Sequence, residues 1–182
     1  MRYTLDFQQY VYLQTRFGAL CVCARNTGLC EVAFLTKDKV SNIENFSTTS
    51  KNIFSIESNS IITILQTFID WLRDYEACHF RNIDFPLDFG RSSAFEQKIL
   101  LTCLTIPPGQ TRTYRQLAVD AGLSPSYARA VARVMANNHL PLVIPCHRVV
   151  ASNGFGGYGP GVSVKITLLQ HEALFPFHGG LP

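Results

Sequence analysis

Hydrophobic and polar residues alternate along the first part of the chain in a way that is typical of β-strands. Three runs rich in β-branched and aromatic residues, at 10–13, 19–24 and 30–35, are separated by the turn-forming sequences Thr-Arg-Phe-Gly and Arg-Asn-Thr-Gly. From Ile61 to Tyr75 the apolar residues change to the spacing of an amphipathic helix. The polar residues 36–58 are expected to form a long surface connection. This pattern predicts a small α/β unit with a three-stranded sheet.

The periodicity stops between Asn82 and Arg91, where Pro and Gly appear. We interpret residues 82–92 as a linker. It would separate an N-terminal domain, residues 1–81, from a C-terminal domain, residues 93–182.

The chain after the linker has a helical pattern with clear start and stop signals. Ser93-Ala-Phe-Glu96 and Thr113-Tyr-Arg-Gln116 each match a capping box, and the Pro-Pro-Gly sequence at 107–109 ends the first of the two helices. Ser124-Pro125 then begins a third helix over 126–136. The last two helices, in tandem, predict a helix-turn-helix. The expected fold class is therefore two-domain α+β, with a winged-helix-like C-terminal domain.

The third predicted helix has small and basic side chains on neighbouring stripes. Arg129 and Arg133 lie one turn apart, beside Ala128, Ala132 and Ala136. A helix that reads the major groove usually presents several polar side chains, whereas alanines permit close approach to a surface. The pattern favours contact with the minor groove of DNA. Packing of the alanines against a neighbouring helix is the alternative.

Charge is distributed unevenly between the two halves. Residues 1–90 have eight Lys/Arg and ten Asp/Glu, a net charge of −2, whereas residues 91–182 have eight and three, a net charge of +5. A basic half suggests a polyanionic partner. A solvated basic surface without a partner is the alternative.

The composition is that of an ordinary soluble protein, with 182 residues, 47% of them hydrophobic. No apolar run approaches the roughly 18 residues of a membrane span, and the N-terminal sequence MRYTLDFQQY is too polar for a signal peptide. We expect an intracellular protein, in the cytoplasm or the nucleoid or nucleus, with no membrane partner.

The six cysteines are irregularly spaced and form no C-x-x-C pair, so we expect reduced thiols. Cys21, Cys23, Cys30, Cys78 and His79 do not form a clear zinc-ligand pattern. The prediction is no metal and no cofactor.

One cysteine stands out in the sequence Ile-Pro-Cys-His-Arg-Val-Val at 144–150. A free thiol is only a few per cent ionised at neutral pH, so a nucleophilic Cys146 needs a base. His147 is adjacent, and the irregular backbone that Pro145 imposes, or a bridging water, would let the two side chains communicate. Glu172, in the predicted helix 162–174, is the candidate to orient the imidazole.

A longer series of motifs surrounds this sequence: G-x-T-x-T-Y at 109–114, A-R-A-V at 128–131, Asn138, P-C-H-R-V at 145–149, G-Y-x-x-G at 157–161, Lys165 and L-L-x-x-E at 168–172. Over residues 93–174 the chain resembles the methylated-DNA–protein-cysteine methyltransferases, also called O6-alkylguanine-DNA alkyltransferases. The first ninety residues agree with this family only in layout.

The resemblance implies repair of double-stranded DNA by irreversible, stoichiometric transfer of an alkyl group from O6-alkylguanine, or from O4-alkylthymine, to Cys146 of a monomeric protein. It implies that His147 is a base acting through water and that Glu172 orients the imidazole. Asn138 would tie the reactive turn together, and Tyr114 would crowd a phosphate and support protonation of the leaving group.

The same resemblance assigns the contacts with DNA and the pocket. Arg129 would fill the gap left by the extruded base, and Ala128, Arg133 and Tyr114 would contact the duplex. The substrate pocket would be formed by Val149, Gly157, Tyr158 and Gly159.

The chain also departs from the family pattern. His139, not proline, follows Asn138, the loop 153–158 is one residue shorter than in several relatives, and Gly159 stands where some have serine. These differences concern how the guanine oxygen is held and which alkyl groups fit.

Two other classes of protein use parts of the same residue set. A cysteine hydrolase would need Cys146, His147 and Glu172, but neither a helix-turn-helix nor Arg129. A non-catalytic DNA-binding module, such as a winged-helix regulator or a lesion binder, would need the basic half but not the thiol of Cys146.

Overall fold

The computed structural model describes residues 8–36 and 59–173. The chain divides into two compact units, residues 1–90 and 91–182. The connection that we predicted at 36–58 lies, except for residue 36, outside the described residues.

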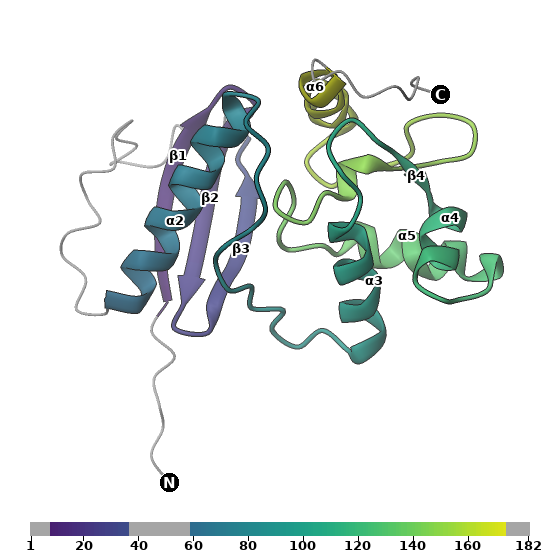
Figure 1. Ribbon diagram of the computed structural model, residues 1–182, viewed down its shortest axis with the longest axis horizontal. Helices are drawn as coiled ribbons and strands as arrows, with labels where there is room; N and C mark the ends of the chain where they lie inside the picture. The colour runs from purple at the N-terminus through teal and green to yellow at the C-terminus, as the bar shows by residue number, and fades with distance from the viewer. Residues whose placement is uncertain (1–7, 37–58, 174–182) are drawn as a thin grey trace, which may run out of the picture. The chain divides into compact units, whose positions relative to one another are not determined.

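The N-terminal unit is a three-stranded antiparallel sheet with a helix on one face (Figure 1). Its elements are β1 (Gln8–Thr15), β2 (Gly18–Arg25), β3 (Gly28–Phe34) and α2 (Asn59–Glu76). Strand residues such as Leu20 and Val22 and helix residues such as Leu65 and Phe68 are buried, and these apolar faces form the core of the unit. The predicted sheet and helix are confirmed.

The segment that we expected to be a linker is partly built into this unit. Phe85 is buried, the backbone N–H of Leu29 donates to the carbonyl of Pro86 (2.9 Å), and that of Asp88 donates back to the Leu29 carbonyl (2.8 Å). A side chain at Gly28, whose φ is +149°, would place its Cβ 2.7 Å from the Pro86 oxygen. Only glycine therefore permits this close contact between the segment and β3.

The C-terminal unit consists mainly of short helices. Its elements are α3 (Ala94–Leu104), β4 (Arg112–Thr113), α4 (Tyr114–Asp120), the 3₁₀ turn η2 (Pro125–Tyr127), α5 (Ala128–Ala136), the 3₁₀ turn η3 (Cys146–Arg148), β5 (Val149–Val150) and α6 (Val162–Ala173). Both predicted capping boxes are formed, at Ser93 and at Thr113. The helices α4 and α5 pack together as the predicted helix-turn-helix.

The third helix begins later than predicted. The Ser124 hydroxyl accepts a hydrogen bond from the backbone N–H of Ser126, and the N–H of Tyr127 donates to the Ser124 carbonyl (3.0 Å). These short-range bonds close a 3₁₀ turn, so α5 starts at Ala128. Among the described residues, no helix combines the length and apolar character that crossing a bilayer requires.

Candidate active site

A tight turn presents Cys146. Pro145 has φ −79° and ψ 58°, and the backbone N–H of Cys146 donates to the carbonyl of Ile144 (2.7 Å). This is the geometry of an inverse γ-turn, and the 3₁₀ turn η3 follows it directly. Cys146 and His147 therefore lie on neither a strand nor an α-helix, as the proline suggested.

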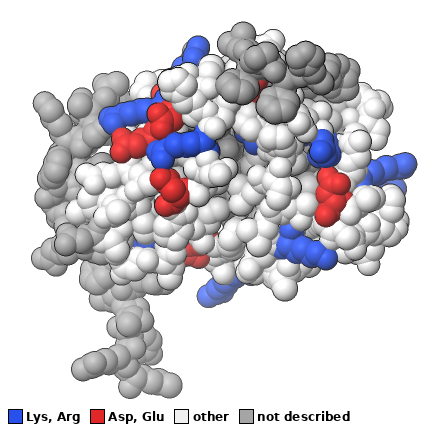
Figure 2. Space-filling view, viewed as in Figure 1, with Lys and Arg blue, Asp and Glu red and all other residues white. Residues whose placement is uncertain are grey.

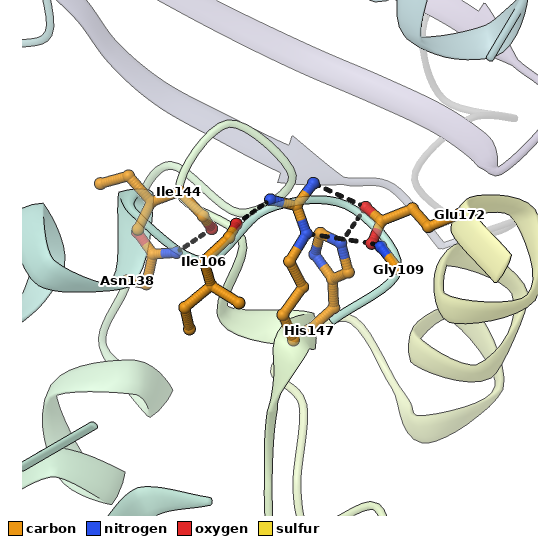
Figure 3. Close-up of polar contacts among 7 residues, drawn as sticks. Ile106, Gly109, Asn138, Ile144, His147 and Glu172 are labelled. Carbon is orange, nitrogen blue, oxygen red and sulfur yellow. Dashed lines mark hydrogen bonds and ion pairs between the residues drawn. The ribbon is translucent and has the colours of Figure 1, made fainter. Parts of the chain in front are cut away.

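Asn138, two residues after α5, bonds to this turn at several points. Its Nδ2 donates to the Ile144 carbonyl and to the Cys146 Sγ, both at 3.1 Å, and its Oδ1 accepts from the Leu140 N–H at 3.0 Å. Figure 3 shows the Asn138 amide directed at the Ile144 carbonyl. The asparagine thus connects the backbone of the turn with the sulfur.

The Cys146 thiol is buried, and burial raises its pKa to about 11. The hydrogen bond from Asn138 and the positive charge of Lys165 act in the opposite direction, because both favour the thiolate. The thiol is therefore protonated at neutral pH and requires a base to react.

The buried Glu172 carboxylate, on α6, is surrounded by donors. Its Oε1 contacts the His147 Nε2 and accepts from the Arg148 Nη2, both at 2.8 Å. Its Oε2 accepts from the Arg148 Nε at 3.0 Å and from the backbone N–H of Gly109 at 3.4 Å. In Figure 3 the His147 ring and Gly109 both face the Glu172 carboxylate. Burial alone would raise the pKa of Glu172, but His147 and Arg148 hold it well below its usual range.

The ionised carboxylate determines the tautomer of His147. A carboxylate can only accept, so the His147 Nε2 carries the proton and its Nδ1 has a free lone pair. This Nδ1 is buried and has no hydrogen-bond partner among the described residues. Burial also lowers the pKa of His147, against the opposing effect of Glu172. The imidazole is thus a neutral base with an available nitrogen.

Two basic residues of the site had received no role from the sequence. Arg148 contacts Glu172, and the buried Lys165 Nζ donates to the carbonyls of Val149 (2.7 Å) and Gly157 (3.2 Å). Burial lowers the pKa of Lys165 to about 8. The sequence did contain a signal for Lys165, because it lies at helical spacing from Leu168, Leu169 and Glu172. These residues share the buried face of α6.

Tyr158 and Tyr114 lie beside the reactive turn. The Tyr158 ring meets the His147 ring edge-on with 6.3 Å between centroids, and its buried hydroxyl has no partner among the described residues. Burial raises the pKa of both tyrosines, and a negative charge on Cys146 would raise it further. A Cβ at Gly156 would lie 3.1 Å from the Tyr114 hydroxyl, which explains the small residue there.

The other predicted pocket residues follow in the same loop and in β5. Val149 is buried, whereas Gly157 and Gly159 are exposed, and a Cβ on either glycine would meet no atom within 4 Å. The structure places two hydrogen-bonded pairs on the same turn, Asn138 with Cys146 and His147 with Glu172, and the two tyrosines lie beside them.

The predicted DNA-binding residues lie outside this buried cluster, on α5. Arg129 and Arg133 are exposed and Ala128 is half-buried, while Val131, Val134 and Met135 form the core side of the helix. The alanine stripe is therefore not the packed face of α5.

The surface of the C-terminal unit is basic. Six basic residues remain at least partly exposed when the buried Arg148 and Lys165 are set aside: Arg91, Lys98, Arg112, Arg115, Arg129 and Arg133. Only Glu96 and Asp120 oppose them, because Glu172 is buried, so the net surface charge is +4. Figure 2 shows Lys and Arg side chains standing out from this unit.

The described residues offer no metal site, since no three His, Cys, Asp or Glu residues lie together in a suitable group.

The chain is similar to known proteins both in sequence and in structure. Residues 94–174 match the family described as "6-O-methylguanine DNA methyltransferase, DNA binding domain". The methylated-DNA–protein-cysteine methyltransferase of Methanothermobacter thermautotrophicus is 43% identical over 96 residues, which are 50% of this chain and 53% of that protein. The Mycobacterium tuberculosis protein of the same name is 38% identical over 105 residues, 57% and 62% of the two chains. The match thus spans less than two thirds of each relative.

The solved structures extend the similarity to nearly the whole chain. The crystal structure of Mycobacterium tuberculosis OGT in complex with DNA has a TM-score of 0.71 and 27% identity, and the match covers 91% of this chain and 92% of that one. A second structure, of Mycobacterium tuberculosis O6-methylguanine methyltransferase, has a TM-score of 0.70 and covers 95% of this chain and 97% of the other. The two-domain α+β fold predicted from the sequence is confirmed.

Proposed function

Because the chain belongs, through residues 94–174, to the family of methylated-DNA–protein-cysteine methyltransferases, we propose that it repairs DNA by transferring an alkyl group from O6-alkylguanine to Cys146. The observation that carries this proposal is the buried Cys146 thiol, bonded to Asn138 and followed by a neutral imidazole whose Nδ1 is free. The sulfur is held in place by Asn138, and the base is the next residue in the chain.

The reaction needs an extruded nucleotide, because the guanine O6 is out of reach inside a duplex. The Cys146 Sγ attacks the alkyl carbon, an S–C bond forms, and the C–O bond breaks with its electron pair remaining on the guanine oxygen. The thiol proton passes through water to His147, and the guanine takes up a proton delivered by Tyr114. His147 thereby gains one proton and the Tyr114 phenol loses one, so the overall charge is unchanged, and proton exchange with solvent then returns both side chains to their neutral forms.

The base is necessary because of the environment of the sulfur. A thiol with a pKa of about 11 costs about 5 kcal/mol to ionise at pH 7. The Asn138 donor and the nearby positive charge of Lys165 stabilise the thiolate once His147 has taken the proton. The product is a thioether, which no group in the cluster can cleave, so each molecule reacts once.

We assign DNA binding to the basic face of the helix-turn-helix. Arg129 and Arg133 are exposed on α5, and the small side chain of Ala128 on the same helix permits close approach to a duplex. Arg129 would fill the space of the extruded base. Tyr114 would meet the backbone beside the flipped nucleotide. In this proposal the protein acts in the cell as a monomer on alkylated double-stranded DNA.

We assign the substrate pocket to the glycine-rich loop at 156–161. Tyr158 offers an unpartnered buried hydroxyl, and the open Gly157 and Gly159 leave room for an alkyl group next to Val149. A lesion binder without chemistry would not need the Cys146, His147 and Glu172 arrangement, and we do not favour it.

The substitution Cys146→Ser tests the role of the sulfur. A hydroxyl has nearly the same volume but a far higher pKa than a thiol, so transfer of a labelled methyl group from duplex DNA should be abolished. Binding of the same duplex should remain within about twofold of wild type, or about 0.4 kcal/mol. Residual methyl transfer in this variant would refute the assignment of Cys146.

A further inference from the structure

Arg148 occupies a position that the proposed reaction does not yet use. It is buried directly after His147 and bonds to the same carboxylate, with its Nε on Oε2 and its Nη2 on Oε1 of Glu172. Its remaining nitrogen, Nη1, donates to the carbonyl of Ile106, just beyond the end of α3. The guanidinium thus joins η3, α6 and the segment after α3.

We propose that Arg148 is a positioning residue for the alkyl transfer, which holds the Glu172 carboxylate in one orientation and offsets its charge, so that His147 stays neutral with Nδ1 free. The effect of Arg148 on the rate of alkyl transfer rests on the proposed function, whereas the effect of Arg148 on His147 can be measured without any reaction.

The geometry supports the orienting role. Two parallel N–H bonds from a planar guanidinium fix both the plane and the rotation of a carboxylate, and a single ammonium cannot do this. With Gly109 on Oε2 and His147 on Oε1, each oxygen of Glu172 has two partners, which is close to the capacity of a carboxylate. Without Arg148 the carboxylate could rotate away from the Nε2 of His147.

The charges around His147 support the second role. Glu172 and Lys165 face it from α6, Arg148 and the thiol of Cys146 belong to its own turn, and the Tyr158 ring lies against it from the glycine loop. Glu172 favours the imidazolium, whereas burial, Arg148 and Lys165 oppose it. Without Arg148, less positive charge offsets the negative charge of the Glu172 carboxylate at His147. The ring would then hold a proton at a higher pH, and a protonated ring cannot take up the thiol proton.

Two substitutions separate orientation from charge. Arg148→Gln removes the charge and the fork, whereas Arg148→Lys keeps the charge and removes the fork. Arg73→Gln is the control, because Arg73 forms an ion pair with Asp70 on the exposed face of α2 (3.0 Å). The primary measurement is the ¹⁵N spectrum of the His147 imidazole in the free protein between pH 5 and 9.

Wild type and Arg73→Gln should show a neutral ring with the proton on Nε2 throughout most of this range. In Arg148→Gln the protonation midpoint should rise by about one pH unit or more. In Arg148→Lys it should stay closer to wild type, but the Nε2–H tautomer should lose its dominance. The second measurement is the rate of Cys146 alkylation by free benzylguanine against pH, whose acidic limb should move with the midpoint in Arg148→Gln.

A purely structural arginine would lower stability in both variants and leave the midpoint and tautomer of His147 unchanged, and that result would overturn the proposal. If Arg148→Gln does not fold, Arg148→Lys is the test. An unchanged His147 tautomer and an unchanged pH-independent rate of Cys146 alkylation in this variant would show that the two hydrogen bonds from Arg148 to Glu172 do not orient the carboxylate. Shifts of the ¹⁵N midpoint as expected, combined with no alkylation of wild type by benzylguanine or by duplex containing O6-methylguanine, would support the effect of Arg148 on His147 and refute the proposed function instead.

Discussion

Individual polar side chains, and not apolar packing alone, fix the reactive turn. Asn138 reaches two backbone groups and the sulfur, and Glu172 reaches His147 and Arg148. Hydrogen bonds of this kind contribute about 1 kcal/mol each, but leaving a buried partner unsatisfied costs more. Loss of either residue should therefore affect both stability and reactivity.

Asn138→Ala removes the link between the Ile144 carbonyl and the Cys146 sulfur. We expect the free energy of unfolding to fall by about 2 kcal/mol and Cys146 to react with benzylguanine at least tenfold more slowly. Urea unfolding and the alkylation rate measure the two effects. His139→Ala, at the exposed neighbouring position, is the control and should resemble wild type. Similar losses in both variants would show that the segment, and not the Asn138 amide, matters.

Glu172→Gln should destabilise the protein by about 3 kcal/mol at pH 7, because it leaves the buried Arg148 without its countercharge. The pKa of Glu172 is lowered by folding, so its contribution is fully present above the unfolded pKa of about 4.3 and is lost progressively as the pH falls below that value toward the lower folded pKa. Folding also lowers the pKa of His147, so His147 loses stability in the same direction. It does so more strongly in Glu172→Gln, because the carboxylate that favours the imidazolium is gone.

In a His147→Gln background, which removes the imidazole titration, the difference in unfolding free energy between Glu172 and Glu172→Gln proteins should narrow by about 1 kcal/mol at about pH 3.5. Asp120→Asn, which breaks the surface pair with Arg112, should cost less than about 1 kcal/mol. A difference that stays constant between neutral and acidic pH would contradict the assigned ionisation of Glu172.

At this scale the sequence indicated candidate residues where a chemical type was unusual for its place. Cys146 and His147 stood out beside Pro145, and Glu172 was the acidic residue one helix later. The role of Arg148 depends on Ile106 and Glu172, both distant in the sequence, so no local pattern could reveal it.

Among the secondary-structure elements, the helix-turn-helix carries the proposed contact with DNA. The capping boxes at Ser93 and Thr113 were visible in the sequence because their two partners are three residues apart. The start of α5 at Ala128 was not visible in the sequence, since Ser124 can cap either an α-helix or the 3₁₀ turn that the structure has. The sequence did not reveal the contact of residues 86–88 with Leu29, because a single isolated β-bridge produces no periodic pattern of hydrophobic residues.

Arg129→Ala should slow methyl transfer from duplex DNA by about tenfold or more, because nothing would occupy the place of the flipped base and unstacking costs a few kcal/mol. Transfer from free benzylguanine should be unchanged, since no extrusion is needed. Arg73→Ala, an exposed arginine of α2, is the control for loss of positive charge. Equal slowing with both substrates would remove Arg129 from the extrusion step.

At the scale of the whole molecule, the two units differ in charge, and the basic unit contains the reactive cluster. Its six exposed basic residues against two acidic ones predict binding to undamaged duplex as well, through phosphates. The affinity should fall linearly with salt on logarithmic axes, with a slope set by the number of phosphate contacts. An affinity that persists over a tenfold rise in salt, measured by fluorescence anisotropy, would contradict this mode of binding.

The central claim is that Cys146 takes the alkyl group and keeps it. The most direct test is the mass of the intact protein after incubation with excess duplex containing O6-methylguanine, followed by peptide mapping. We predict a gain of one methylene group per molecule, located on the peptide with Cys146, and a repair burst that equals the protein concentration and then stops. Several repaired lesions per molecule, or a methyl group on Cys103 or any other cysteine, would contradict the account.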